Sequence, residues 1–176
     1  SLIYEKLPRS MGEELARQYA QANEWSIGFI KGRIDEHGID CDFKQLPAYL
    51  YTRSDEYVEK LEQEAIAASN AGIKAQYTEV TELPFEVKAA LKFHKQAQFH
   101  PRKYLLALAD KIPGDGSAIY ENTRAIDIIE GEKNTVVTHS GAKVTAGTVV
   151  LATHYPFWDR HGLYFTRIYP ERSYLM

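Results

Sequence analysis

The chain has 176 residues, of which 44% are hydrophobic and 26% charged, and its net charge is −3. These values are typical of a globular protein and exclude a disordered chain. A charge this small, without blocks of one sign, gives no long-range attraction for nucleic acid or anionic lipid. The single cysteine, Cys41, excludes an intrachain disulfide framework and favours a reducing, cytoplasmic location. No apolar run reaches the ~20 residues that a membrane-spanning helix needs, and the histidines lack the spacing of metal ligands.

The first half of the chain is predicted to begin with a long helix. Ser10 and Glu13 have the spacing of a capping box, in which each side chain satisfies a free main-chain amide at a helix start. Apolar residues then recur at helical spacing as far as Gly38, which can end the helix in a left-handed conformation. Further helices are predicted over residues 54–72 and 101–112.

Strands are predicted between and after these helices. Residues 39–52 alternate apolar and polar side chains around a proline, which predicts either a strand pair or one bent strand. Residues 89–100 predict another strand. Residues 118–139 predict short strands that end in a β-ribbon, and residues 144–153 predict an apolar strand that returns to the sheet.

The order of elements in the second half indicates a nucleotide-binding sheet. A helix, short strands, a β-ribbon and a final apolar strand are typical of the closing half of such a sheet. The opening half needs a first strand, then G-x-G-x-x-G, then an acidic residue about 20 positions on. No such motif occurs in this sequence. We therefore expect a fragment of an enzyme that lacks the first β-α-β unit.

Three runs of residues carry a resemblance to a known family: QFHPRKYLL (98–106), IYENT (119–123) and VLATHYP (150–156). They resemble the D-amino-acid oxidase family of FAD-dependent oxidoreductases, which includes glycine and sarcosine oxidases and D-amino-acid dehydrogenases. The resemblance is strongest to bacterial glycine/D-amino-acid oxidases, some of which carry a C-terminal Rieske domain. It implies an enzyme that oxidises a C–N bond of an amino acid or amine, with hydride transfer to the flavin.

The resemblance also implies an α+β fold, with some α/β character, in two lobes. Residues 1–98 would form a substrate-binding lobe with a mixed sheet. Residues 99–176 would supply the later strands of a Rossmann-like FAD-binding lobe. The tail, predicted to begin a further strand at Arg172, would return toward the substrate-binding lobe.

The family pattern places two segments near the cofactor. The main chain of Arg124, Ala125 and Ile126 would contact the adenine edge, with Ala125 the first choice. The segment Ala152, Thr153 and His154 would pass close to FAD, although the family usually has glycine where this chain has His154. Because the motif that holds the pyrophosphate is missing, we expect FAD in the full-length protein and not in this fragment alone.

Candidate substrate-binding residues are Tyr49, Tyr51, His100, Tyr164 and Arg172. The carboxylate of an amino-acid substrate needs a cation, which Arg172 would supply if the tail lines the cavity. His100 would either face the substrate or make a local hydrogen bond at a helix start. No nucleophile–base–acid set stands out, so no catalytic residue is predicted. This is consistent with chemistry in which the flavin accepts the hydride.

Two alternatives stay open. The chain could be a non-catalytic ligand-binding or interaction module with an independent α+β fold, because the nucleotide-binding motif is missing. It could also form a homodimer through strand edges left unpaired in the fragment.

Overall fold

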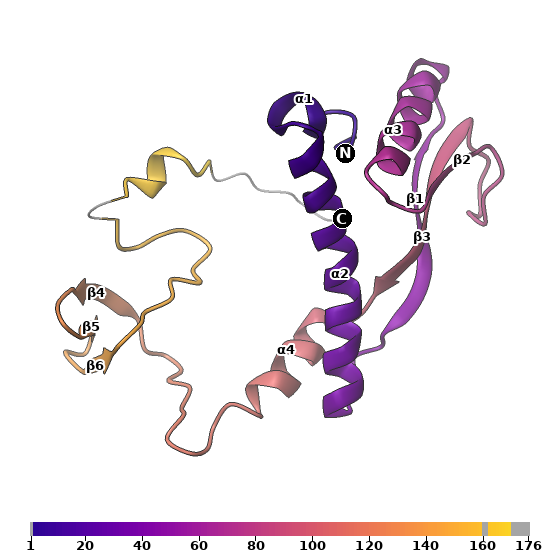
Figure 1. Cartoon of the computed structure of the whole chain (residues 1–176). Helices are drawn as coiled ribbons and strands as arrows, with labels where there is room; N and C mark the ends of the chain where they lie inside the picture. The colour runs from indigo at the N-terminus through magenta and orange to yellow at the C-terminus, as the bar shows by residue number, and fades with distance from the viewer. Residues whose placement is uncertain (1, 160–161, 170–176) are drawn as a thin grey trace. The chain divides into compact units, whose positions relative to one another are not determined.

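The computed structural model describes residues 2–159 and 162–169 of the chain. They form two compact units, Ser1–Gly116 and Ser117–Met176 (Figure 1). Helices and two antiparallel sheets make up the units, which confirms the predicted α+β class.

Unit 1 contains most of the regular structure. Its elements are, in chain order, α1 (Leu7–Met11), α2 (Glu13–His37), β1 (Lys44–Thr52), the 3-10 helix η1 (Asp55–Tyr57), α3 (Val58–Asn70), β2 (Ala75–Thr78), β3 (Ala89–Gln98) and α4 (Pro101–Ala109).

The long helix α2 begins differently from the prediction. Ser10 is not its cap: it lies in the short helix α1, where its hydroxyl donates to the carbonyl of Leu7 at 3.1 Å. Pro8 favours this separate helix because its fixed φ suits a first turn. Gly12, with φ 84°, makes the bend into α2. The predicted end of α2 is confirmed, since Gly38 has the left-handed conformation and donates to the carbonyl of Ile34.

The sheet of unit 1 has the order β1-β3-β2, with both pairs antiparallel. The bent-strand prediction is confirmed for β1, whose register shifts between Leu46 and Ala48. Pro47 explains the shift, because it has no N–H to donate to β3. Residues 39–43 precede the strand and do not belong to it. The four-residue strand β2 was not predicted, because it is too short to show an alternating pattern.

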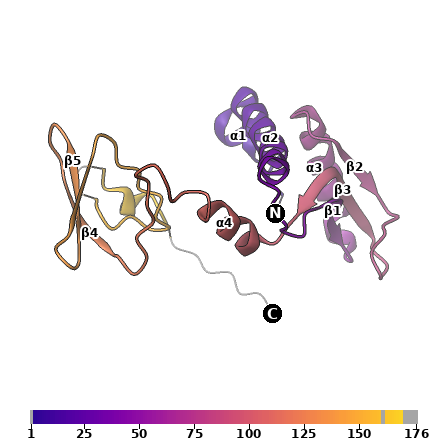
Figure 2. The ribbon, with the colours of Figure 1, turned by 90° about the horizontal axis from the view of Figure 1, so that it is seen from below.

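Helix α3 covers one face of this sheet, as Figure 2 shows. Its side of the core contains Leu61 and Ala65 of the helix, together with Ala89 and Leu91 of β3. The predicted cap Ser54 makes no side-chain hydrogen bond to the helix start; η1 precedes α3 instead. Because side chains alternate across a strand, every second residue of β1 and β3 points to the face opposite α3.

Glu64 of α3 is almost fully buried, with 1% of its surface exposed. Its carboxylate accepts three main-chain N–H groups, from Ile3 at 2.7 Å, Tyr4 at 2.8 Å and Glu5 at 2.8 Å. Such charge-assisted hydrogen bonds offset the loss of water around a buried carboxylate. They fix the segment before α1 against α3, and Leu2 of this segment packs on the core beneath.

Helix α4 belongs to unit 1 by its packing. Tyr104 lies in one cluster with Ile34, Ile39 and Cys41, and the amide of His100 donates to the carbonyl of Cys41 at 2.7 Å. The break between the compact units therefore follows Gly116 and not residue 98. The division into a substrate-binding lobe (1–98) and a partial FAD-binding lobe (99–176) is a functional one and stays a prediction.

Unit 2 is built on a three-stranded antiparallel sheet with the order β4-β5-β6. The strands are β4 (Ala125–Ile129), β5 (Asn134–Thr138) and β6 (Lys143–Ala146), and the 3-10 helix η2 (Tyr164–Thr166) follows. The predicted β-ribbon is confirmed as β4 and β5. The short strand predicted at residues 118–120 is wrong, because these residues have no strand conformation.

The strand predicted over residues 144–153 is wrong beyond Ala146. Asn134, the first residue of β5, pairs with Ala146, so β5 has no further residue to pair with the continuing chain. Val150 is 80% exposed in an irregular segment. The further strand predicted at Arg172 lies outside the described residues.

The buried carboxylate gives a stability prediction. We expect Glu64→Gln to lower the free energy of unfolding by about 1–3 kcal/mol, because its amide group leaves one of the three N–H donors without an acceptor. Denaturant unfolding followed by circular dichroism measures this loss. The control is Glu62→Gln, at an exposed position of the same helix, which should change stability little. If both variants unfold alike, the three hydrogen bonds do not anchor the segment.

Candidate functional site

Tyr49 and Tyr51 lie two residues apart on β1, and their side chains share the face of the sheet opposite α3. Their partners on β3 are Lys92 and Ala90. Leu50, between them, packs on the other face in the α3 core. The structure thus brings two of the predicted substrate-binding residues together.

A charged cluster lies beside Tyr49 on this face. The Nζ atom of Lys92 is 3.1 Å from Oε1 of Glu82 and 5.4 Å from the centre of the Tyr49 ring. Two hydrogen bonds raise the pKa of Lys92 above its usual value: the bond to the Tyr49 hydroxyl has the larger effect, and the bond to Glu82 the second largest. Lys92 in turn lowers the pKa of Glu82. Both groups are therefore charged at neutral pH, and the Lys92 side chain is only 24% exposed.

A cavity of about 330 Å³ adjoins this pair, and we call it the Lys92 cavity. This volume is at the lower end of the range for small-molecule pockets. Three of its seven lining side chains are basic or imidazole groups of β3, so it favours an anion. The lining residues are Gln45, Leu46, Pro47, Glu82, Lys92, His94 and Lys95.

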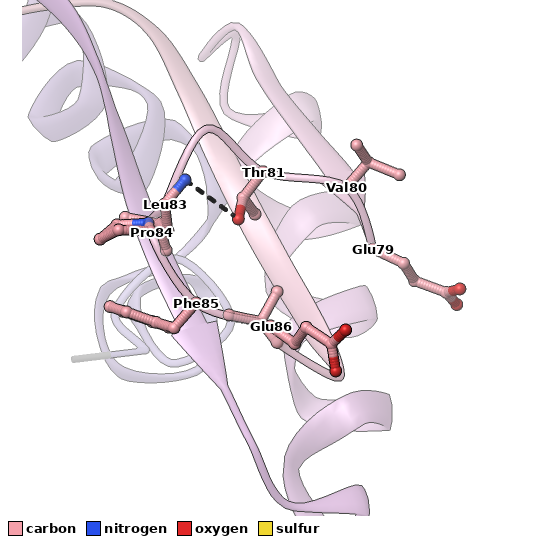
Figure 3. Close-up of a pocket in the computed structure, with 8 residues that line it drawn as sticks. Glu79, Val80, Thr81, Leu83, Pro84, Phe85 and Glu86 are labelled. Carbon is pink, nitrogen blue, oxygen red and sulfur yellow. Dashed lines mark hydrogen bonds between the residues drawn. The ribbon is translucent and has the colours of Figure 1, made fainter.

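Residues 79–87, between β2 and β3, form a loop over the same face. Figure 3 shows this loop, with Pro84 and Phe85 directed to one side and Glu79 to the other. The rings of Phe85 and Tyr51 lie 5.2 Å apart. Ala90, the β3 partner of Tyr51, is completely buried although α3 lies on the other side of the sheet. The loop is therefore held on the sheet by an aromatic contact and by the Glu82–Lys92 ion pair.

His100 is separate from this face and caps the start of α4. Its Nδ1 accepts the amide of Lys103 at 3.4 Å, which confirms the predicted local hydrogen bond. A cavity of about 400 Å³ lies beside it, lined by Asp42, Gln98, Phe99, His100 and Pro101. Contact between His100 and a substrate stays a prediction.

The predicted adenine-contacting residues lie at the start of β4, which is an edge strand of its sheet. The main chain of Arg124 pairs with His139, donating to Nδ1 at 3.3 Å and accepting from its amide at 2.9 Å. Ala125 lies opposite Thr138, whereas Ile126 falls at a register shift and has no cross-strand partner. A bulged edge strand can offer main-chain groups to the rim of an adenine ring, and the position of Ile126 at the register shift fits this contact, whereas both main-chain groups of Arg124 are already paired with His139.

The other predicted cofactor residues lie in the irregular segment after β6. Ala152, Thr153 and His154 are all exposed there. Tyr164 begins η2, and its amide donates to the carboxylate of Asp159 at 2.7 Å. Arg172 lies outside the described residues.

Sequence reasoning missed Lys92 and Glu82, although the i, i+2 spacing of Lys92 and His94 on a strand signals one shared face.

No described helix is long and apolar enough to cross a membrane. The described parts of the chain contain no group of three or more His, Cys, Asp or Glu residues that could hold a metal ion.

Comparison with known protein families matches residues 3–176 to the FAD dependent oxidoreductase family, DAO. The chain belongs to this family. A protein of Bacillus subtilis strain 168 that is named as a Rieske 2Fe-2S iron-sulfur protein, YhfW, is 41% identical over 175 residues, which are 99% of this chain. An oxidoreductase-named protein of Haemophilus influenzae, OrdL, is 25% identical over 179 residues and 96% of this chain.

Two solved structures are similar in fold to this chain. Glycine oxidase from Geobacillus kaustophilus has a TM-score of 0.60 with 21% identity, over 80% of this chain and 39% of its own. L-Proline dehydrogenase from P. horikoshii has a TM-score of 0.58 with 22% identity, over 70% of this chain and 35% of its own. The chain spans only 34% and 41% of the length of the YhfW and OrdL proteins.

The ion pair beside His100 gives a pH prediction. Lys103 Nζ lies 2.7 Å from Oδ2 of Asp42, and the hydrogen bond from Lys103 lowers the pKa of Asp42. A carboxylate with a lowered folded pKa stabilises the fold above its unfolded pKa of ~3.9, and the contribution disappears as the pH falls through the folded value. We expect Asp42→Asn to lose less stability than the unmodified protein between neutral pH and pH ~3.

Denaturant unfolding at a series of pH values measures this difference. The control is Asp110→Asn, at an exposed aspartate just after the other end of α4. If Asp42→Asn and Asp110→Asn have the same acid profile, the ion pair makes no contribution of its own.

Proposed function

We propose that the protein of which these residues are part is an FAD-dependent oxidoreductase that oxidises a C–N bond of an amino acid or amine. The observation that carries the proposal is the match of residues 3–176 to the FAD dependent oxidoreductase family. The substrate class is supported by the fold likeness to a glycine oxidase and an L-proline dehydrogenase, whose names both specify an amino acid. FAD, when bound, accepts the hydride from the carbon beside the nitrogen.

We propose that this chain contributes two surfaces to the cofactor. The main chain at Arg124, Ala125 and Ile126 would hold the adenine edge, and the exposed segment from Ala152 to His154 would lie near the rest of FAD. The G-x-G-x-x-G motif that holds a pyrophosphate does not occur in these 176 residues. We therefore expect FAD to bind in the full-length protein and not to these residues alone.

The substrate-binding residues proposed are Tyr49, Tyr51, His100, Tyr164 and Arg172. Their task is to bind and orient the amine, since the hydride acceptor is the cofactor.

We expect a cytoplasmic protein, and we keep edge-to-edge dimerisation as a separate proposal. One part of the β4 edge is covered: the carbonyl of Ile128 accepts the Trp158 indole N–H at 3.1 Å.

Anaerobic reduction of the flavin tests the proposal. The full-length protein is expected to purify with flavin absorbance, and the absorbance is expected to bleach on addition of glycine, sarcosine, L-proline, D-alanine or an alkylamine. A full-length protein that cannot be loaded with FAD would instead favour the non-catalytic binding module. A flavoprotein that none of these compounds reduces would contradict the proposed substrate class.

A main-chain contact to adenine makes a further prediction. Ile126→Pro removes one N–H group at a position without a cross-strand partner, where an edge strand tolerates proline. We expect FAD to bind the full-length variant roughly three- to tenfold more weakly, the loss of about one hydrogen bond. Equilibrium titration with FAD measures this.

Ile126→Ala is the matched control, because it removes the side chain and keeps the amide. It should bind FAD like the unmodified protein. Equal weakening by alanine and proline would show that the side chain is the contact and not the main chain.

A further inference from the structure

The Lys92 cavity contains a cation and an anion that already lie at hydrogen-bond distance from each other. Lys92 Nζ and Glu82 Oε1 are 3.1 Å apart. Lys92 comes from the middle of β3, whereas Glu82 comes from the loop 79–87 and has 71% of its side chain exposed. The cation is thus placed by a strand, and the carboxylate is placed by a loop and is the more exposed partner.

An α-amino acid presents the complementary pair of charges. Its carboxylate and its ammonium group are joined through one carbon atom, so a ligand of this class can contact both partners of a separated ion pair. An exposed ion pair contributes little net stability, so a ligand can separate this one at small cost. A simple amine would use Glu82 alone and leave the less exposed Lys92 without a new partner.

The rest of the cavity supports an anion next to Lys92. His94 and Lys95 of β3 line the same hollow, and the neighbouring Tyr49 ring packs beside the ammonium group. His94 is held in place, because its Nε2 lies 3.3 Å from Oε1 of Gln76 on β2. The volume of about 330 Å³ admits a small amino acid.

We propose that the Lys92 cavity binds a small amino acid, with Lys92 holding its carboxylate and Glu82 its ammonium group. Without a ligand, Glu82 forms the ion pair with Lys92, and the carboxylate of the ligand replaces it there. The proposal rests on the proposed function for its substrate class and assigns the two charged groups of an amino-acid substrate to named side chains.

Calorimetric titration of the purified full-length protein, with its flavin already reduced and oxygen excluded so that no turnover occurs, tests the proposal with three matched probes. Sarcosine carries both charges, dimethylamine lacks the carboxylate, and acetate lacks the amine. We expect sarcosine to bind at least about tenfold more tightly than dimethylamine or acetate, because dimethylamine can contact only Glu82 and acetate only Lys92. Glycine and L-proline serve as second and third amino acids, and failure of all three to bind would overturn the proposal.

Variants of the ion pair give effects of opposite sign. Lys92→Gln should weaken the binding of sarcosine and of acetate at least about tenfold. Glu82→Gln should weaken sarcosine but strengthen acetate, because the competing carboxylate is gone. A merely structural role of Glu82 in holding the loop would weaken both probes, and that outcome would overturn the proposal.

Lys88→Gln is the matched control. Lys88 also pairs with a carboxylate at 3.1 Å, that of Asp55, but it does not line the cavity. Equal affinities of Lys88→Gln and Lys92→Gln for sarcosine would contradict the assignment.

Flavin reduction separates the two proposals. If amino acids reduce the flavin equally well in Lys92→Gln, the oxidase function stands and the cavity assignment fails. If sarcosine binds with the expected pattern but no amino acid reduces the flavin, the cavity assignment stands and the oxidase function fails.

Discussion

The arrangement of unit 1 depends on the buried carboxylate of Glu64. A charge without water is unfavourable unless hydrogen bonds replace the solvent, and here three consecutive main-chain amides do so. The bonds join α3 to residues that are about 60 positions away in the sequence. Tyr4 and Leu2 of that segment each pack against one of two core clusters, and Phe93 packs against both, so the carboxylate also influences how the start of the chain packs on the sheet.

The central strand β3 contributes side chains to both faces of the sheet, one that packs on α3 and one that carries polar and aromatic side chains. Leu91 points to α3 and is completely buried, whereas its neighbour Lys92 points to the opposite side. The loop 79–87 covers part of that side and brings Glu82 to Lys92. The charged and aromatic side chains of Tyr49, Tyr51 and Lys92 are therefore placed by two paired strands, and Glu82 reaches Lys92 from the loop.

The sequence could predict those parts of the fold that depend on local signals. Gly38 ended a helix and Pro101 began one where expected, because their backbone preferences act within one turn. The family itself was also predictable, from three short runs of residues. Contacts between distant segments were not: nothing near Glu64 indicates its three amide partners. The ion pair of Lys92 depends on strand register and loop path, and the end of β6 at Ala146 depends on the length of β5.

The two tryptophans fall one in each unit, and their surroundings differ. Trp25 of α2 is 67% exposed and stacks on Phe29. Trp158 is partly buried, and its indole donates to the carbonyl of Ile128 in β4. Each unit thus carries one tryptophan of its own. When only the indoles are excited, replacing either of them by phenylalanine leaves an emission that reports on one unit, so separate or joint melting of the two can be distinguished optically.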